Sequence, residues 1–131
     1  MIEVGTVLPE RIFFIDRAML TSYADASGDQ NPIHQNEEFA VSVGLPNVIA
    51  HGMLTMALVG KYVSDFAGGA GHVLEFGARF TKPVIVAAGE KVDLTVSATV
   101  SEILDGKISL TLSATSAGVK VLGMAKAVVR K

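Results

Sequence analysis

The run Gly28–His34 (GDQNPIH) places a carboxyl group, a carboxamide and an imidazole close together in a stretch that favours a turn. Asp29 and His34 are five positions apart and would lie on different faces of a helix, but Gly28 and Pro32 disfavour a continuous helix there. In a tight loop both side chains can point into one cavity. An acid and an imidazole that share a cavity can hold a water molecule and take its proton.

The same run also has a purely structural interpretation. Asp and Asn side chains hydrogen-bond the backbone two residues further on, so Asp29 and Asn31 could form Asx-turns beside a surface histidine at position 34. Spacing alone favours this second interpretation. A second motif, Ala50–Thr55 (AHGMLT), reverses that preference, because the two motifs together can form a reaction site.

The second motif begins the longest predicted helix, residues 51–66. Backbone N–H groups in the first turn of a helix have no acceptor within the helix and lie at the positive end of its dipole. Gly52 leaves this end sterically open. Its N–H could stabilise the negative charge that develops on an acyl carbonyl oxygen, where losing one such donor costs on the order of 3 kcal/mol. The motif therefore predicts an oxyanion hole.

Two shorter helices are predicted earlier in the chain. One covers residues 17–27 with Asp16 as its N-cap, and the other covers residues 37–44, which begin with acidic residues and end in a glycine. The first ten residues of the helix at 51–66 include no acid, lysine or arginine, so this helix is apolar on all sides. A helix of that kind is normally surrounded by protein.

Four later segments alternate apolar and polar residues with period two, which predicts strands. They are residues 73–80, 92–101, 108–115 and 119–129. Asp105-Gly106 predicts a hairpin turn between the second and third strands. The helix at 51–66 is the element apolar enough to cover the dry face of such a sheet. The predicted fold class is α+β, a single domain over residues 1–131 with an antiparallel sheet wrapped around a long central helix.

Composition excludes several classes of function. The chain has 131 residues, 50% hydrophobic and 18% charged, with 11 basic and 13 acidic residues and a formal net charge of -2. No basic run could neutralise a phosphate backbone, and no apolar run is long enough for a membrane span, so neither nucleic acid nor a membrane is an expected partner. The chain has no cysteine and begins with no recognisable leader, and we expect a cytoplasmic protein.

Tyr23–His34 and Ala50–Thr55 together resemble the signature of the MaoC-like (R)-specific enoyl-CoA hydratases, the hydratase 2 family. The resemblance extends loosely over nearly the whole chain through Phe80–Val84 and Gly89–Val92. It implies a hot-dog fold, in agreement with the sheet and central helix predicted above. It also implies an enzyme of fatty acid metabolism, a hydro-lyase.

The resemblance implies a role for four residues. In that family the residues that match Asp29 and His34 bind and activate water, the one that matches Asn31 supports them, and the amide that matches Gly52 polarises the thioester carbonyl. The implied reaction is reversible syn addition of water to a trans-2-enoyl thioester, which gives a (3R)-3-hydroxyacyl thioester. It implies no cofactor beyond coenzyme A or acyl carrier protein as the substrate carrier.

Five further residues are expected at the substrate site. Ser27, His51 and Met53 are expected to line it, with His51 mainly a structural residue at the start of the helix and Met53 mainly core filler. Arg79 and Lys82 could meet the phosphates of coenzyme A, although a cation at a strand end is usually only solvated.

The central helix of some relatives carries a serine near the site. This chain has Gly60 at the matching position, so Thr55 or Ser64 would have to replace that hydroxyl. A metal site is not predicted, because His34 and His51 form no spaced pair of ligands on one helix, with or without Glu37.

Three other functions remain open at this point. Residues 28–34 and 50–56 are also similar to the catalytic dehydratase subunits of mycobacterial type II fatty-acid synthase, which implies a 3-hydroxyacyl-ACP dehydratase subunit in a heterodimer. A non-catalytic thioester-binding subunit and a hot-dog thioesterase are the remaining alternatives. Exposed sheet edges favour oligomers, so we expect a homodimer or a hot-dog heterodimer.

Overall fold

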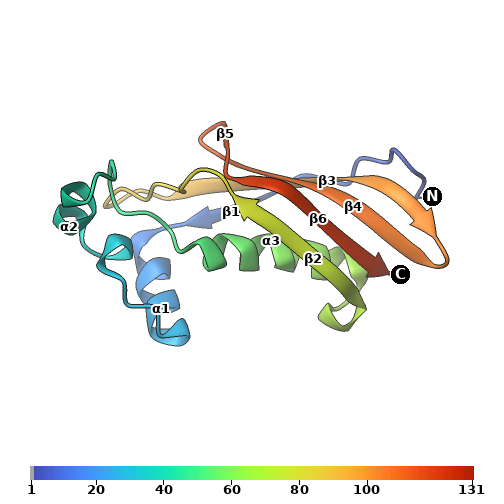
Figure 1. Cartoon of the computed structure of the whole chain (residues 1–131), viewed down its shortest axis with the longest axis horizontal. Coiled ribbons are helices and arrows are strands. Elements are labelled where there is room, and N and C mark those ends of the chain that lie inside the picture. Colours follow the sequence, from blue (N-terminus) through green and yellow to red (C-terminus); the bar gives the residue numbers. More distant parts are fainter. Residues whose placement is uncertain (1) are drawn as a thin grey trace.

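The protein, described by a computed structural model over residues 2–131, is an antiparallel sheet packed on one long helix (Figure 1). The strands are β1 (Arg11–Ile15), β2 (Val73–Phe80), β3 (Val92–Leu104), β4 (Lys107–Ser116), β5 (Val119–Lys120) and β6 (Leu122–Arg130). Their order in the sheet is β1-β3-β4-β6-β2, with β5 paired to β4. All of these pairs are antiparallel, so the predicted α+β class is confirmed.

All three predicted helices are present; the first has the predicted bounds, the second ends two residues earlier than predicted, and the third is shifted by one residue. They are α1 (Arg17–Ser27), α2 (Glu37–Ser42) and α3 (Gly52–Ala67), with short 3-10 turns η1 (Pro32–His34) and η2 (Ala70–His72). The Asp16 side chain caps α1 by accepting from the Met19 N–H at 2.9 Å, and Gly28 ends the helix with a φ of 81°. Glycine adopts that left-handed conformation without the steric cost of a Cβ.

Two features of the sheet differ from the prediction. The last predicted strand is divided into β5 and β6, which pair separately. Strand β1 was not predicted, because its sequence RIFFI is apolar almost throughout and shows no alternation. Residues 5–8 also lie along β3, where the Leu8 N–H donates to the Ala98 carbonyl oxygen at 2.8 Å.

Helix α3 is covered by the sheet on one side only. Its buried residues form a single stripe and pack with the inward side chains of the strands in one hydrophobic core. These buried residues are Leu54, Thr55, Val59, Tyr62, Val63 and Ala67. On the opposite side Ala57 and Lys61 are exposed, and Met53 is 59% exposed. The prediction that protein surrounds this helix is therefore wrong for the single chain.

Two glycines of α3 allow strand β2 to approach the helix. A Cβ on Gly52 would lie 3.0 Å from the ring of Phe80, and one on Gly60 would lie 3.2 Å from the ring of Phe76. The absence of a side chain at these positions lets both aromatic rings rest on the helix backbone. Gly60 therefore has a packing role where some relatives carry a serine.

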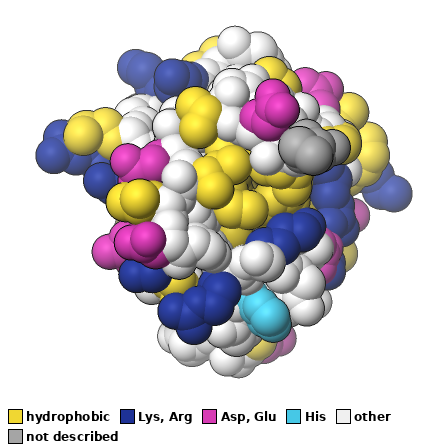
Figure 2. Space-filling view, turned by 90° about the vertical axis from the view of Figure 1, so that its right-hand side faces the viewer, with side chains coloured by type: hydrophobic (Ala, Val, Ile, Leu, Met, Phe, Trp, Pro, Cys, Tyr) yellow, Lys and Arg dark blue, Asp and Glu magenta, His cyan; other side chains and the backbone are white. Residues whose placement is uncertain are grey.

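The two ends of α3 have different surroundings. Helices α1 and α2 gather near the N-terminal end of α3, whereas both chain termini lie near its other end (Figure 1). Figure 2 looks onto the end with the termini, where apolar side chains collect in a central hollow with basic and acidic side chains around it. Among residues 2–131, no helix is both long and apolar enough to span a membrane.

Candidate active site

The loop that follows α1 is held by short hydrogen bonds between its own residues. The Asp29 carboxylate accepts from the Asn31 N–H at 3.2 Å, and the Asn31 side-chain oxygen accepts from the Ile33 N–H at 3.2 Å. The Ser27 hydroxyl accepts from the Asp29 N–H, also at 3.2 Å. The Asx-turns of the structural interpretation are therefore present. Ser27 and the Asn31 oxygen thus help to shape the loop.

His34 is not a surface residue, because only 7% of it is exposed. Its Nδ1 lies 2.7 Å from the carbonyl oxygen of Ile49. A carbonyl oxygen can only accept, so Nδ1 carries the ring proton and Nε2 of the neutral imidazole keeps a free lone pair. This tautomer makes His34 a proton acceptor at Nε2.

The segment before α3 connects the loop to the residues that follow β2. The Ile49 N–H donates to the Ile33 carbonyl oxygen at 3.2 Å, and the Ala50 N–H donates to the Val84 carbonyl oxygen at 2.8 Å. An isolated bridge pairs Ile49 with Ile85. These contacts join two stretches that carry no predicted secondary structure, and they bring residues 28–34 beside residues 82–86.

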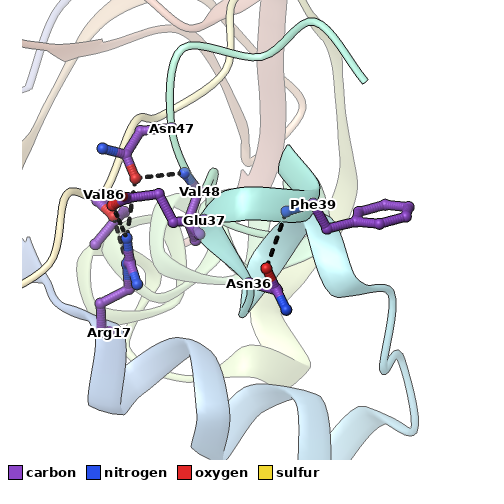
Figure 3. Close-up of polar contacts among 7 residues, drawn as sticks. All are labelled: Arg17, Asn36, Glu37, Phe39, Asn47, Val48 and Val86. Atoms are coloured by element: carbon purple, nitrogen blue, oxygen red, sulfur yellow. Dashed lines mark hydrogen bonds and ion pairs between the residues drawn. The ribbon is translucent and has the colours of Figure 1, made fainter. Parts of the chain in front are cut away.

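Arg17 of α1 makes polar contacts with several segments around the same site (Figure 3). Its Nε donates to the Val86 carbonyl oxygen at 2.6 Å, and its Nη2 donates to the Asn47 side-chain oxygen at 2.9 Å. A longer contact of 3.3 Å joins Nη2 to the Glu37 carboxylate of α2. The guanidinium group thus holds together four segments that surround the site. No pattern in the sequence indicated this role.

Asp29, His34 and His51 form a compact polar cluster. One ligand-type atom from each lies within 4.8 Å of the others. A single water can bridge groups at that separation with two ordinary hydrogen bonds. The two imidazoles are stacked, with centroids 3.9 Å apart and planes inclined by 21°. Glu37 is not part of this cluster and pairs with Arg17 instead.

A cavity of about 310 Å³ lies next to this cluster. His34, Gly52, Thr55, Phe80 and Lys82 contribute to its wall. The Gly52 N–H belongs to the first residue of α3 and so has no acceptor within the helix. A residue that can accept a proton and a residue with a preorganised donor therefore line one partly open cavity, which is the arrangement that acyl thioester chemistry needs.

The comparison with known proteins agrees with this geometry. The MaoC like domain matches residues 5–119, which is most of the chain. The chain belongs to the MaoC-like family. Its residues 28–34 and 50–55, which suggested the resemblance, lie within the matched range. The recognition made from the sequence is confirmed.

Similar proteins of known structure confirm the hot-dog fold of this MaoC-like chain. A solved MaoC-like dehydratase is 38% identical with a TM-score of 0.94, over 98% of this chain and 40% of that one. The unliganded R-hydratase PhaJ1 from Pseudomonas aeruginosa is 30% identical with a TM-score of 0.84, over 98% of this chain and 81% of that one. The 3-hydroxyacyl-thioester dehydratase X of Mycobacterium tuberculosis is 38% identical over 80 residues, 61% of this chain and 28% of the relative.

The structure separates the residues that were expected to contact substrate. Lys82 contributes to the cavity wall. Arg79 is exposed on β2 next to Phe80, and since alternate strand residues point to opposite faces, it points away from α3. Met53 is exposed and is not among the wall residues. His51 is only 1% exposed and is also not among the wall residues.

Thr55 and Ser64, the two residues that could replace the serine hydroxyl of some relatives, lie in different places on α3. Thr55 is buried and contributes to the cavity wall. Ser64 lies further along α3, where its hydroxyl donates to the Gly60 carbonyl oxygen at 2.9 Å. Thr55 is therefore the hydroxyl residue of α3 that lies at the site.

The surroundings of His51 shift the pKa of its imidazole. Removal from water lowers the pKa of His51, and the nearby ring of His34 lowers it further. The contact with the Asp29 carbonyl oxygen and the Asp29 charge oppose this shift without cancelling it. His51 therefore gains a proton less readily than a free histidine, whose pKa is about 6.5.

Stability of the fold should decrease as the pH falls below that value. The unfolded chain gains a proton at position 51 near about pH 6.5 while the folded chain does not, so acid favours the unfolded state. Thermal midpoints measured from about pH 8 to about pH 5 should decline, and His51→Phe should flatten the decline. The control His72→Phe changes an exposed histidine and should leave it intact. Identical slopes for the wild type and His51→Phe would contradict this assignment.

Proposed function

We propose that this chain carries the active site of an (R)-specific enoyl-thioester hydratase, acting reversibly as a 3-hydroxyacyl-thioester dehydratase. The observation that carries the proposal is that His34 and Gly52 line one cavity, with a polar atom of Asp29 within 4.8 Å of His34. The names of the similar dehydratase and R-hydratase support the same chemistry. The proposed substrates are a trans-2-enoyl thioester and a (3R)-3-hydroxyacyl thioester.

In the proposed reaction the thioester carbonyl oxygen accepts a hydrogen bond from the Gly52 N–H. Asp29 and His34 hold a water molecule and remove one of its protons while its oxygen bonds to C3. The electrons of the C2–C3 double bond move toward C1, and the enolate oxygen that forms is stabilised by the Gly52 amide. A proton from the same pair is then delivered to C2 on the same face, which restores the carbonyl group. Asp29 and His34 act here as one unit.

The reaction needs no cofactor beyond the thioester carrier, because proton transfer and charge stabilisation come from side chains and a backbone amide. We propose coenzyme A as the carrier. Lys82 is the cation of the cavity wall, which supports a contact with a carrier phosphate, whereas Arg79 points away from α3. Dialysis against a chelator should leave the activity unchanged.

We also propose that the active form is a dimer of this chain. Met53 and Phe80 are 59% and 55% exposed, and both lie beside Gly52 at the N-terminal end of α3. Apolar surface gathered at one place in this way is typical of an interface. Light scattering on the purified chain measures the state directly. A monomer that becomes active only with a second subunit of the same fold would instead support the heterodimeric dehydratase.

Crotonyl-CoA tests the proposed activity. The purified chain should consume the enoyl thioester absorbance, and chiral analysis should show the (3R)-hydroxyacyl product. Release of free thiol would indicate a thioesterase. Binding of enoyl-CoA by calorimetry without turnover in either direction would indicate a non-catalytic thioester-binding subunit. A comparison of coenzyme A and acyl carrier protein substrates over short and long acyl chains would then define the carrier and the chain-length preference.

A further inference from the structure

His51 is the residue immediately before Gly52, and its side chain is buried. It is 1% exposed and does not contribute to the wall of the cavity that His34 and Gly52 share. As the N-cap of α3 it makes no side-chain capping hydrogen bond. Its side chain points instead toward the loop that carries Asp29. Its place in the site therefore has to be explained by its neighbours.

The His51 ring has one hydrogen bond and one stacking contact with the proposed catalytic pair. Its Nε2 lies 3.2 Å from the Asp29 carbonyl oxygen, and its face stacks on His34 at a centroid distance of 3.9 Å. The third contact is with Tyr23 of α1, edge to face at 4.7 Å. One side chain thus touches the backbone of the acid and the ring of the imidazole, while its own backbone leads directly into the Gly52 amide.

The second ring nitrogen of His51, Nδ1, shows that the residue does more than fill space. Because the Asp29 carbonyl oxygen can only accept, Nε2 of His51 carries the proton and Nδ1 keeps a lone pair. Among the described residues, Nδ1 is buried and has no hydrogen-bond partner. A buried unsatisfied polar atom costs stability. A phenylalanine would fill the same space without that cost, so the polar Nε2–H is what distinguishes histidine at this position.

The same arrangement keeps His51 out of proton transfer. A second proton on the ring would lie on Nδ1, where it would be buried without an acceptor and beside the ring of His34. The titratable groups next to the His51 ring are those of Asp29, His34 and Tyr23. Burial accordingly lowers the pKa of His51. The ring does not compete with His34 for the proton of the proposed reaction.

We infer that His51 is a positioning residue, which ties the Asp29 backbone and the His34 ring to the first turn of α3 and so fixes the water-activating pair relative to the Gly52 N–H. This inference rests on the proposed function. Errors of about 1 Å in the placement of reacting groups can cost about 10²-fold in rate. Since His51 does not line the cavity, its loss should reduce kcat and leave KM nearly unchanged.

His51→Phe tests this inference, because it keeps an aromatic ring on His34 and removes only the hydrogen bond to Asp29. We expect a folded chain whose kcat for crotonyl-CoA is about 10- to 100-fold lower, with KM within about twofold. His51→Gln keeps a donor near the position of Nε2 and should recover part of that kcat. The matched control is His72→Phe, since His72 also contacts a carbonyl oxygen, that of Arg130 at 3.1 Å, but is exposed on η2. It should behave as wild type.

A second readout does not depend on activity. In the ¹⁵N-labelled chain, His51→Phe should shift and broaden the backbone amide signals of residues 28–34, and His72→Phe should not. Wild-type kcat in His51→Phe, or a raised KM at unchanged kcat, would overturn the inference while leaving the proposed function intact. An inactive wild-type chain would instead overturn the proposed function, and unchanged amide signals in His51→Phe would then overturn the positioning role as well.

Discussion

Replacing His34 with asparagine is expected to lower kcat for hydration of crotonyl-CoA by about 10²- to 10⁴-fold. Asparagine can keep a side-chain N–H near the position of Nδ1, and so can still donate to the Ile49 carbonyl oxygen, which His34 approaches at 2.7 Å. What it lacks is the free lone pair at Nε2. The fold and the loop should survive while the proton acceptor is lost. Steady-state kinetics and a thermal melt of the same sample measure both effects.

Asp29→Asn should have a loss of similar size for a related reason. Its side-chain oxygen can still accept from the Asn31 N–H, so the Asx-turn at 3.2 Å is retained and only the charge is removed. Because Asp29 and His34 are proposed to act as one unit, the double variant should be little worse than either single variant. The control is Asp25→Asn, an exposed acid on α1 that accepts from Gln30 at 3.1 Å. Normal turnover by Asp29→Asn and His34→Asn would refute the proposed site.

The sheet and α3 were predictable because their patterns are local. Period-two alternation marks β3 and β4, because it indicates which side of a strand is buried, and a long apolar stretch marks α3 as a core helix. Strand β1 was not predicted, because a run such as RIFFI fits a buried strand or a helix equally well. The exposed side of α3 was not predicted either, because an apolar helix surface does not show whether the same chain covers it.

The residue types of the candidate site were predictable from the sequence, but the contacts that join them were not. Asp29, His34 and Gly52 were identified from two short motifs, and the structure brings the two motifs together. The contacts of Arg17 and His51 join residues far apart in the sequence, so no local pattern could indicate them. The sequence named Arg79 and Lys82 together, and the difference in their directions follows from the contact of Phe80 with α3, which the structure supplies.

Gly52→Pro is expected to lower kcat by at least about 10²- to 10³-fold, because it removes the N–H that would stabilise the enolate oxygen. Proline is well suited to the first position of a helix, where Gly52 lies. The preceding residue must be extended, and His51 already has φ -58° and ψ 132°. The backbone can therefore accept the substitution, and a melt close to that of the wild type should accompany the loss of activity.

Gly52→Ala is the control that isolates the N–H. Alanine and proline both add a Cβ, which would lie 3.0 Å from the Phe80 ring, so both displace that ring by a similar amount. Phe80 is 55% exposed and has room to move. Only proline removes the donor, so the ratio of the two kcat values measures the contribution of the amide, free of the steric effect that the variants share. Equal activity in Gly52→Pro and Gly52→Ala would mean that the charge is stabilised elsewhere, with Thr55 as the nearest hydroxyl of α3 on the cavity wall.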